Sequence, residues 1–219
     1  RSSAATRADR FAAISGWRRY RPHVSTDGLG RRTYLGYALG SVGTAGFSTV
    51  PGLLLAYYLT NSLGVAAAIA ALVVLVPKLW DVVFLPIVGT LSDRSAQRRH
   101  SRRPFLLLGG LALPVVFILM FATPSALGEL GSAAWVLVFF LLAASAFALF
   151  QVPYIAMPAE ITDSVEERTT MMSWRVAFLA FGILLFGVGA PALRDLGSGG
   201  GSGYLLMGVV VAGLIALGM

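Results

Sequence analysis

Long uninterrupted apolar runs, separated by short polar segments, dominate the pattern along the chain. A helix needs about 20 apolar residues to cross the roughly 30 Å hydrocarbon core of a bilayer. A membrane-spanning barrel would instead show short segments that alternate between apolar and polar positions, and runs such as 105–120 do not alternate. The pattern therefore predicts an all-α membrane protein with six transmembrane helices, at 34–60, 66–91, 105–123, 133–159, 170–192 and 204–219.

Basic residues are unevenly divided between the two sets of connecting segments. Segments 1–33, 92–104 and 160–169 hold eight, five and one Lys+Arg, whereas the segments on the other side hold only Arg194. Loops rich in Lys and Arg stay in the cytoplasm. We therefore expect an integral multi-pass protein of a bacterial inner membrane, with a basic cytoplasmic tail over 1–33 and a bundle over 34–219 that has the lipid bilayer as its surroundings.

Composition excludes several classes of function. Of the 219 residues 57% are hydrophobic and 12% charged, and most of the net charge of +7 comes from the connecting segments, so nucleic acid is not an expected partner. There is no cysteine, and the two histidines, His23 and His100, lie in arginine-rich stretches. Metal sites and cofactors are therefore not expected. Neither H-E-x-x-H nor a P-loop occurs, which disfavours an enzyme and leaves a transporter or a non-transporting membrane subunit.

Ionisable residues inside predicted spans are the first candidates for a functional site, because charges in a bilayer are costly. In the second span, spacings of three, four and four place Lys78, Asp81, Leu85 and Gly89 on one helical stripe. In one interpretation Lys78 and Asp81 neutralise each other and only hold the helix against its neighbours. In the other they line a polar cavity for a solute or an ion.

Two further spans carry unusual residues. In the first span Gly36 and Gly40 form a G-x-x-x-G pair, which indicates either close helix packing or a locally opened helix along a solute path. In the fourth span Gln151 and Tyr154 share a face beside two prolines. Both side chains could contact a bound solute, and core packing would explain Tyr154 almost as well.

Arg175 lies just over one turn inside the fifth predicted span. A guanidinium there keeps its charge and needs carboxylates or carbonyls nearby. The sequence offers two alternatives for it, a gate pairing or a long side chain that reaches the interface. The candidate partners lie at the end of the preceding span and in the loop after it: Glu160, Asp163, Glu166 and Glu167.

The loop between the second and third spans resembles a signature of the major facilitator superfamily. It reads Gly89-Thr-Leu-Ser-Asp93-Arg94-Ser-Ala-Gln-Arg98-Arg99 and is similar to that superfamily's G-x-x-x-D-R…R-R motif in the same topological place. The resemblance implies that Asp93 and Arg94 help to close two halves of a transporter on the cytoplasmic side. Independently of it, Asp93 could accept hydrogen bonds from nearby arginines.

Two further stretches are similar to the glycoside–pentoside–hexuronide:cation symporters, the melibiose permease group. One is Lys78-Leu-Trp-Asp81-Val-Val-Phe-Leu85-Pro-Ile-Val-Gly89, and the other is Pro153-Tyr154 through Glu160 and Asp163 to Glu167-Arg168-Thr169, followed by Arg175. The resemblance covers roughly 33–192. It implies a twelve-helix transporter of which this chain is the N-terminal six-helix half, with the solute site between the halves. The end of the sixth run at Met219, without a polar flank, also predicts a fragment that lacks the C-terminal six-helix half.

Three positions depart from the pattern of the sugar-transporting members. Where those members carry acidic residues, this chain has Ala45, Leu85 and Gln151. We therefore predict a secondary active transporter of a small solute, a sugar or glycoside, working by alternating access, with a proton rather than sodium as coupling cation, or no coupling at all. An amphipathic lipid is the alternative solute, which a mostly apolar cavity would favour over convergent polar groups.

Overall fold

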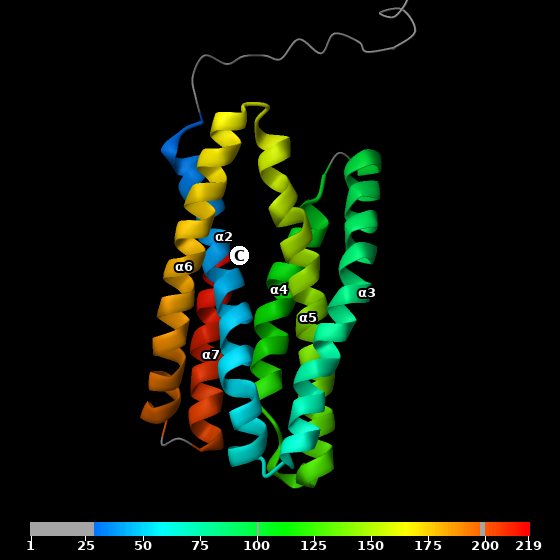
Figure 1. The fold of residues 1–219 in the computed structure, drawn as a ribbon, viewed down its shortest axis with the longest axis vertical. Coiled ribbons are helices and arrows are strands. Elements are labelled where there is room, and N and C mark those ends of the chain that lie inside the picture. Colours follow the sequence, from blue (N-terminus) through cyan, green and yellow to red (C-terminus); the bar gives the residue numbers. More distant parts are fainter. Residues whose placement is uncertain (1–28, 100, 198–199) are drawn as a thin grey trace, which may run out of the picture.

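The computed structural model describes residues 29–99, 101–197 and 200–219, so most of the predicted basic tail over 1–33 lies outside the described residues. The described part is a bundle of long helices that run roughly alongside one another (Figure 1). Six of them are long and apolar enough to cross a membrane, as the sequence pattern predicted. Their bounds are α2 (Arg31–Val50), α3 (Ala67–Arg99), α4 (Arg103–Phe121), α5 (Gly128–Ile161), α6 (Val165–Leu196) and α7 (Gly201–Gly218).

Several helices extend past the apolar runs that predicted them. The run at 66–91 corresponds to α3, which begins at Ala67 and continues to Arg99, and the run at 170–192 lies within α6, which begins at Val165. Apolarity ends where a helix leaves the hydrocarbon, whereas backbone hydrogen bonding continues until a residue breaks it. At the start of α6 the Ser164 side chain accepts a hydrogen bond from the Glu167 backbone N–H, an N-cap that apolarity alone does not reveal.

The first span changes its helical geometry beyond Val50. Two π-helical segments, η1 (Pro51–Leu55) and η2 (Tyr58–Ser62), continue α2 without a break in the chain direction. Pro51 has no backbone N–H, so the regular hydrogen-bond ladder cannot continue through it and the turns widen. Prolines also lie inside α3, α4, α5 and α6, where neighbouring helices support the backbone.

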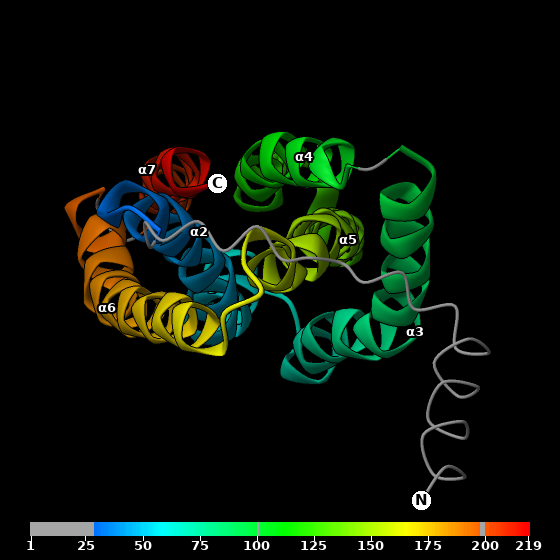
Figure 2. The ribbon, with the colours of Figure 1, turned by 90° about the horizontal axis from the view of Figure 1, so that it is seen from above.

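The helices form a layered bundle with α5 and α2 at its centre. Seen from above, α4 and α7 lie on one side, whereas α3 and α6 flank the opposite face (Figure 2). The strongest packing joins α2 to α6 and α4 to α5, followed by α3 to α5. Two-thirds of the most apolar stretch of α2 is buried, against 17% for α3 and for α6. The face formed by α3 and α6 is therefore the least covered by this chain.

Aromatic side chains fill the core and satisfy backbone groups at the helix ends. Tyr58 donates a hydrogen bond to the Phe121 carbonyl oxygen at 3.0 Å, and Trp135 donates to the Leu119 carbonyl oxygen at 2.9 Å. Both carbonyls belong to the last turn of α4, where the regular helical partners run out; Leu119 also accepts from the Ala122 backbone N–H at the helix end. In a bilayer such groups must be satisfied by protein, because no water reaches them.

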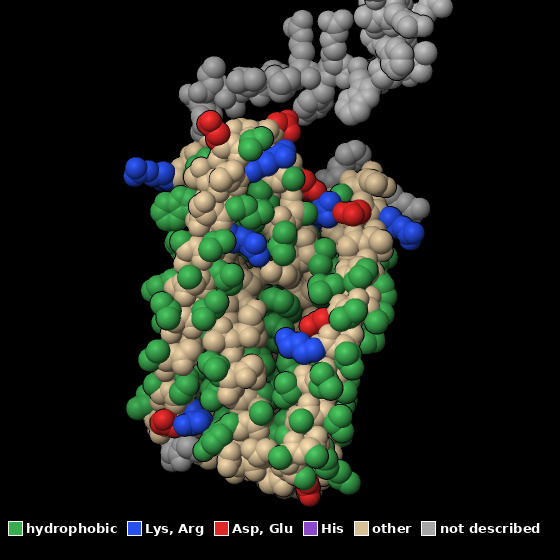
Figure 3. Space-filling view, viewed as in Figure 1, with side chains coloured by type: hydrophobic (Ala, Val, Ile, Leu, Met, Phe, Trp, Pro, Cys, Tyr) green, Lys and Arg blue, Asp and Glu red, His purple; other side chains and the backbone are tan. Residues whose placement is uncertain are grey.

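We call the end where α3 finishes, α4 starts and α5 joins α6 the basic end of the bundle. Charged side chains gather there, and an apolar surface extends away from it (Figure 3). Figure 3 also shows one basic and one acidic side chain side by side near mid-height over α3. Between Ala67 and Ser92 the only charged residues of α3 are Lys78 and Asp81. The surface is thus apolar between charged ends, as in a membrane protein. The exception on this face of α3 is the pair Lys78 and Asp81, two predicted site residues (Figure 3).

Candidate functional site

A buried aromatic cluster joins α2, α5 and α6 in the half of the bundle nearer the basic end. It consists of Tyr37, Phe150, Tyr154 and Met171. The ring centroids of Tyr37 and Tyr154 are 4.7 Å apart, and those of Phe150 and Tyr154 are 5.2 Å apart, both in stacked arrangements. Tyr154 is therefore held between rings from two helices.

The hydroxyl of Tyr154 is also tied to α2. It donates to the Tyr37 carbonyl oxygen and lies 2.9 Å from the Ser41 hydroxyl, which is fully buried. A phenol that already donates one hydrogen bond and shares a second has little capacity left for a solute. The structure therefore places Tyr154 in the core, 3% exposed and with its ring face covered by other side chains, which is the packing role that the sequence offered beside contact with a solute.

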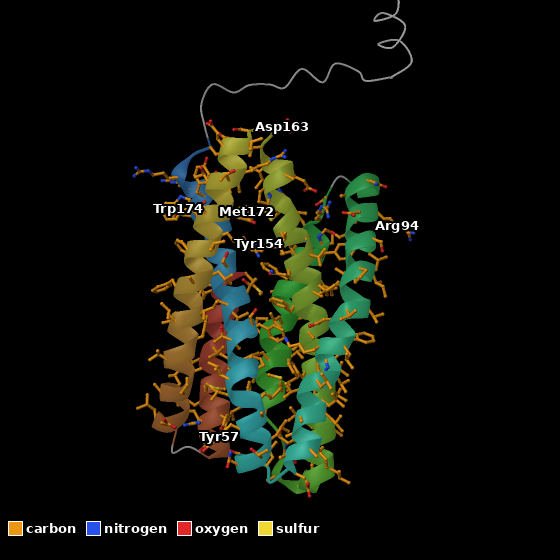
Figure 4. All side chains as sticks on the ribbon, in the orientation of Figure 1. Tyr57, Arg94, Tyr154, Asp163, Met172 and Trp174 are labelled. Atoms are coloured by element: carbon orange, nitrogen blue, oxygen red, sulfur yellow. The ribbon has the colours of Figure 1, made fainter. Side chains whose placement is uncertain are left out.

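Arg175 lies on that ring face. Its guanidinium carbon is 5.5 Å from the centroid of the Tyr154 ring, a cation–π contact. Figure 4 shows Tyr154 inside the bundle, with Trp174 and Met172 nearer the basic end. Sequence analysis expected carboxylate partners for Arg175. Within the described part of the chain no carboxylate pairs with it, and its buried Nε atom has no hydrogen-bond partner.

Gln151 lies one turn before Tyr154 on α5 and is half-buried. Its side-chain carbonyl oxygen is buried and has no hydrogen-bond partner among the described residues. A buried amide without a partner costs about 1–3 kcal/mol, so such groups call for an explanation. Tyr154 thus has an unsatisfied acceptor one turn before it and an unsatisfied donor, the Nε of Arg175, on the helix beside it.

Lys78 and Asp81 occupy adjacent turns of α3. Lys78 is exposed and Asp81 is half-buried, and among the described side chains neither forms an ion pair within 4.0 Å. Between them Trp80 donates a hydrogen bond to the Ser145 hydroxyl of α5 at 2.9 Å, which fixes the rotation of α3 at this point. The structure therefore places Asp81 on the weakly covered face, close to Lys78 in space (Figure 3) but not in a direct ion pair with it.

A second group of charges lies at the basic end, around Arg102. Its guanidinium is 2.8 Å from an oxygen of Asp93 and 2.5 Å from an oxygen of Glu160, and it also donates to the buried Ser92 hydroxyl at 3.0 Å. Burial alone would lower the pKa of Arg102, but its hydrogen bonds to Glu160 and Asp93 outweigh that effect and raise it. One guanidinium thus connects the end of α3 to the end of α5, and we call these residues the Arg102 node.

The structure places Asp93 and Glu160 together at this end, whereas Arg94, which the motif pairs with Asp93, is not their partner. Arg94 is exposed, and Gly89 faces open space. Arg102 was counted only as one of five basic residues in its segment. Its signal was weak, because nothing in the linear spacing distinguishes it from Arg103, and only the fold of the α3–α4 connection brings it between the two carboxylates.

The remaining predicted residues shape the α5–α6 connection. Arg168 donates to the Thr162 carbonyl oxygen at 2.7 Å and lies 3.4 Å from an oxygen of Asp163. Glu167 accepts hydrogen bonds from the Thr162 hydroxyl and, at 3.0 Å, from the backbone N–H of Leu29. Arg168 and Asp163 therefore close a short loop, and Glu167 attaches the segment before α2 to it.

No group of three or more His, Cys, Asp and Glu side chains within the described ranges could hold a metal ion. The acidic residues pair with arginines or cap loops, as the Arg102 node and Asp163 illustrate. The polar atoms left without partners near Tyr154 suit hydrogen bonding to an organic solute better than coordination of a metal.

The close contact between α2 and α5 depends on Gly40. A Cβ at Gly40 would lie 2.7 Å from a ring carbon of Tyr154, whereas a Cβ at Gly36 would meet nothing within 4 Å. Glycines 43 and 46 make similar close approaches to α7 and α6. Of the two interpretations of the first span, the structure supports close helix packing at these positions.

We expect Gly40→Ala to reduce transport several-fold and to lower the thermal stability of the full-length protein. The added methyl group would push a ring that stacking and hydrogen bonds hold on both sides, an overpacking cost of about 1–3 kcal/mol. Gly36→Ala, one turn away on the same helix, is the matched control and should behave like wild type. Melting curves and initial uptake rates test this. Equal behaviour of the two variants would contradict the role assigned to Gly40.

A six-helix bundle that leaves one face weakly covered, with polar groups inside it and a charge network at one end, defines one half of a two-half membrane transporter fold. The comparison with protein families agrees: the model of the MFS/sugar transport protein family matches residues 36–219. The chain belongs to this family, and within the major facilitator superfamily to the glycoside–pentoside–hexuronide:cation symporters.

Relatives of the chain include proteins named for different solutes. It is 34% identical to "Putative glycoside/cation symporter YagG" of Escherichia coli, over 75% of this chain and 36% of the relative. It is 28% identical to "Putative sulfoquinovose importer" of Salmonella typhimurium, over 86% of this chain and 41% of the relative. It is 27% identical to "Sodium-dependent lysophosphatidylcholine symporter 1-A" of Danio rerio, over 68% of this chain and 28% of the relative. The chain thus spans about a third of the length of the curated relatives it matches.

Proposed function

We propose that this chain forms half of a secondary active transporter that carries a sugar or glycoside by alternating access. The observation that carries this proposal is a pair of buried polar atoms without partners, the Gln151 carbonyl oxygen one turn before Tyr154 on α5 and the Nε of Arg175 on α6, whose guanidinium lies over the Tyr154 ring. A helix interior without a ligand role would bury apolar side chains there. A facing six-helix half would complete the site, and the basic end would lie in the cytoplasm of a bacterial cell.

Sugars fit this arrangement because each hydroxyl both donates and accepts. The Gln151 carbonyl oxygen could accept from one hydroxyl, and the Arg175 Nε could donate to another. Sites that hydrogen-bond a solute reject analogues lacking the matching groups, because buried polar atoms are then left unpaired. The YagG relative, named as a glycoside/cation symporter, supports the same solute class.

An amphipathic lipid is the second candidate, and one structural feature favours it. A hollow of about 470 Å³ opens between α2 and α6, lined mostly by apolar and small side chains, namely Ser48, Thr49, Gly52, Leu53, Ile183, Leu184, Gly187 and Val188. An acyl chain could lie against such a surface. A relative named as a lysophosphatidylcholine symporter points the same way. The unpaired Gln151 carbonyl oxygen and Arg175 Nε support the sugar more strongly, since an acyl chain would leave both atoms unpaired.

Uptake by the full-length protein in proteoliposomes tests the proposal directly. The solutes are a panel of radiolabelled methyl glycosides and lysophosphatidylcholine, and protein-free liposomes supply the background. We expect time-dependent uptake of at least one glycoside. Uptake of lysophosphatidylcholine alone would favour the lipid, and uptake of no solute would identify a non-transporting membrane subunit.

A further inference from the structure

A second hollow opens at the end of the bundle opposite the basic end, where α4 finishes and α5 and α7 begin (Figure 1). Its volume is about 550 Å³, within the range of roughly 300–1,000 Å³ that is typical of sites for small molecules. Hydroxyl groups, one carboxylate and aliphatic and aromatic side chains form its wall. We call it the far-end hollow, and its wall includes Thr123, Glu129, Ser132, Gly201, Ser202 and Leu205.

Two hydroxyl groups in this wall lack hydrogen-bond partners. Ser132 is only 5% exposed, yet its hydroxyl makes no hydrogen bond within the described part of the chain. Ser145, on the same helix, instead donates to the Leu141 carbonyl oxygen four residues before it, as serines inside helices commonly do. The Thr123 Oγ1 atom is buried and also has no partner among the described residues. Such groups indicate a ligand that supplies the missing hydrogen bonds from outside the chain.

Glu129 gives the far-end hollow a fixed negative charge. One of its carboxylate oxygens accepts a hydrogen bond from the Ala66 backbone N–H at 2.9 Å, which holds the side chain in place. Arg194, at the same end, pairs with Asp195 at 2.6 Å, and among the described residues no cation lies within 4.0 Å of Glu129. Ser132 follows Glu129 by three residues on α5, so the two side chains share a face. A cationic group with several hydrogen-bond donors would satisfy both.

The start of α7 gives another part of the same wall the opposite character. Gly201 and Ser202 are the first residues of this 18-residue helix. The first backbone N–H groups of a helix have no partner within it, and the helix dipole makes this end favourable for anions. The far-end hollow thus combines a carboxylate with a helix end that favours a phosphate. This charge pattern is complementary to a zwitterion that carries an ammonium and a phosphate close together.

The surroundings of the hollow favour a lipid as the source of that zwitterion. α4 and α7, which form part of its wall, lie on the side of the bundle away from α3 and α6 (Figure 2), and so away from the weakly covered face. Leu205 lines the hollow, and Leu205, Leu206 and Val209 form an exposed apolar surface that continues from it along α7. Acyl chains could lie on this surface while the headgroup occupies the hollow.

We propose that the far-end hollow binds the headgroup of phosphatidylethanolamine. Its ammonium carries three N–H donors, which would donate to Glu129 and Ser132, and its phosphate would accept from the first N–H groups of α7. Phosphatidylcholine has the same phosphate but no N–H donor, and phosphatidylglycerol has no cation for Glu129. The hollow is separate from the residues around Tyr154, so this lipid is a bound partner of the helix bundle and not the transported solute.

Lipid binding to the purified, delipidated full-length protein tests the proposal. Native mass spectrometry gives an apparent Kd for phosphatidylethanolamine, phosphatidylcholine and phosphatidylglycerol with identical acyl chains. Glycerophosphoethanolamine, the same headgroup without acyl chains, is the fourth ligand and separates a lipid from a soluble amine. We expect phosphatidylethanolamine to bind about three- to tenfold more tightly than the other two lipids, because Glu129 is exposed and solvent screens part of its attraction.

Two variants assign this preference to the hollow. Glu129→Gln removes the charge but keeps an oxygen that can accept from the Ala66 N–H, so phosphatidylethanolamine should bind only as tightly as phosphatidylcholine. Ser132→Ala removes one acceptor and should weaken phosphatidylethanolamine binding about threefold. Glu166→Gln is the matched control, because it removes the same charge from an exposed residue at the basic end, and it should keep the wild-type affinities. Melting temperatures without lipid show whether each variant is folded.

The outcomes decide the proposal independently of transport. Equal affinity of wild type for phosphatidylethanolamine and phosphatidylcholine would overturn it, as would a preference for phosphatidylglycerol. A preference that survives in both Glu129→Gln and Ser132→Ala would place the lipid elsewhere and remove the hollow as its site. Glycerophosphoethanolamine that binds as tightly as the lipid would overturn the lipid and assign the hollow to a soluble amine. Glu129-dependent binding of phosphatidylethanolamine by a protein that takes up no glycoside would support this inference and contradict the proposed function.

Discussion

Arg102→Ala is expected to reduce transport about tenfold or more while the protein still inserts into the membrane. The Arg102 side chain is 14% exposed and binds two carboxylates from different helices, Asp93 and Glu160. Asp93 and Glu160 are 62% and 48% exposed, so solvent screens these pairs and each contributes about 0.2–1 kcal/mol to stability. The expected effect is therefore on transport rather than on folding. Here two carboxylates at the junction of α3 and α5 would lose their shared cation and repel each other.

Arg103→Ala is the matched control for this experiment. Arg103 is the next residue, carries the same charge and is exposed, and its backbone N–H, rather than its side chain, donates a hydrogen bond to the Ser101 hydroxyl. We expect near wild-type uptake from it. Asp93→Ala should resemble Arg102→Ala in direction but with a smaller effect, because Glu160 still holds Arg102. Wild-type uptake rates in Arg102→Ala and Asp93→Ala would show that the Arg102 node has no part in gating.

The charged residues of the Arg102 node come from the ends of three different helices. Asp93 comes from the end of α3 and Glu160 from the end of α5, and Arg102 precedes α4. In an alternating-access cycle the two halves must separate and rejoin at this end. In the proposed cycle, a guanidinium with two acceptors would keep three helices of one half together during that movement, so that the half would move as a unit.

The helices could be predicted from sequence because apolar runs of this length have one physical solution in a bilayer. Runs such as 66–91 and 105–123 must form helices, since only helices satisfy every backbone group within one segment. The π-helical continuation of the first span could be anticipated only as a disturbance at Pro51. Its form depends on how neighbouring helices support the widened turns.

The partners within the candidate site could not be predicted in the same way. Arg175 was expected to seek carboxylates, yet it lies on the ring of Tyr154, and Glu160 binds Arg102 instead. Sequence spacing tells which residues share a helix face, but a pairing between helices depends on their rotation and depth. The contribution of α2, through Tyr37 and Ser41, was missed for this reason. The only signal for it was a polar pair flanking Gly40, four residues apart.

The coupling cation is the point on which this chain departs furthest from the family pattern. One of the replaced acidic positions is Ala45, which is fully buried against α6, where a Cβ at Gly182 would lie 2.6 Å from the Ala45 methyl group. No larger side chain fits there without moving a helix. Leu85 has no coordinating atom, and Gln151 brings a neutral oxygen. A sodium ion needs several oxygen ligands, and the described part of this half offers Asp81 alone on α3 at membrane depth.

We therefore expect Asp81→Asn to abolish solute accumulation driven by a proton gradient while solute exchange continues. Asp81 is half-buried on the weakly covered face, with Trp80 hydrogen-bonded to Ser145 to hold α3 in place. A single carboxylate in such a place can bind and release a proton as its surroundings change. Sodium would also be repelled by Lys78 one turn away. The measurement is uptake in proteoliposomes under separate proton and sodium gradients, with counterflow as the control for binding and movement. Strong stimulation of wild type by a sodium gradient at constant pH would contradict the prediction, as would proton-driven accumulation that survives in Asp81→Asn.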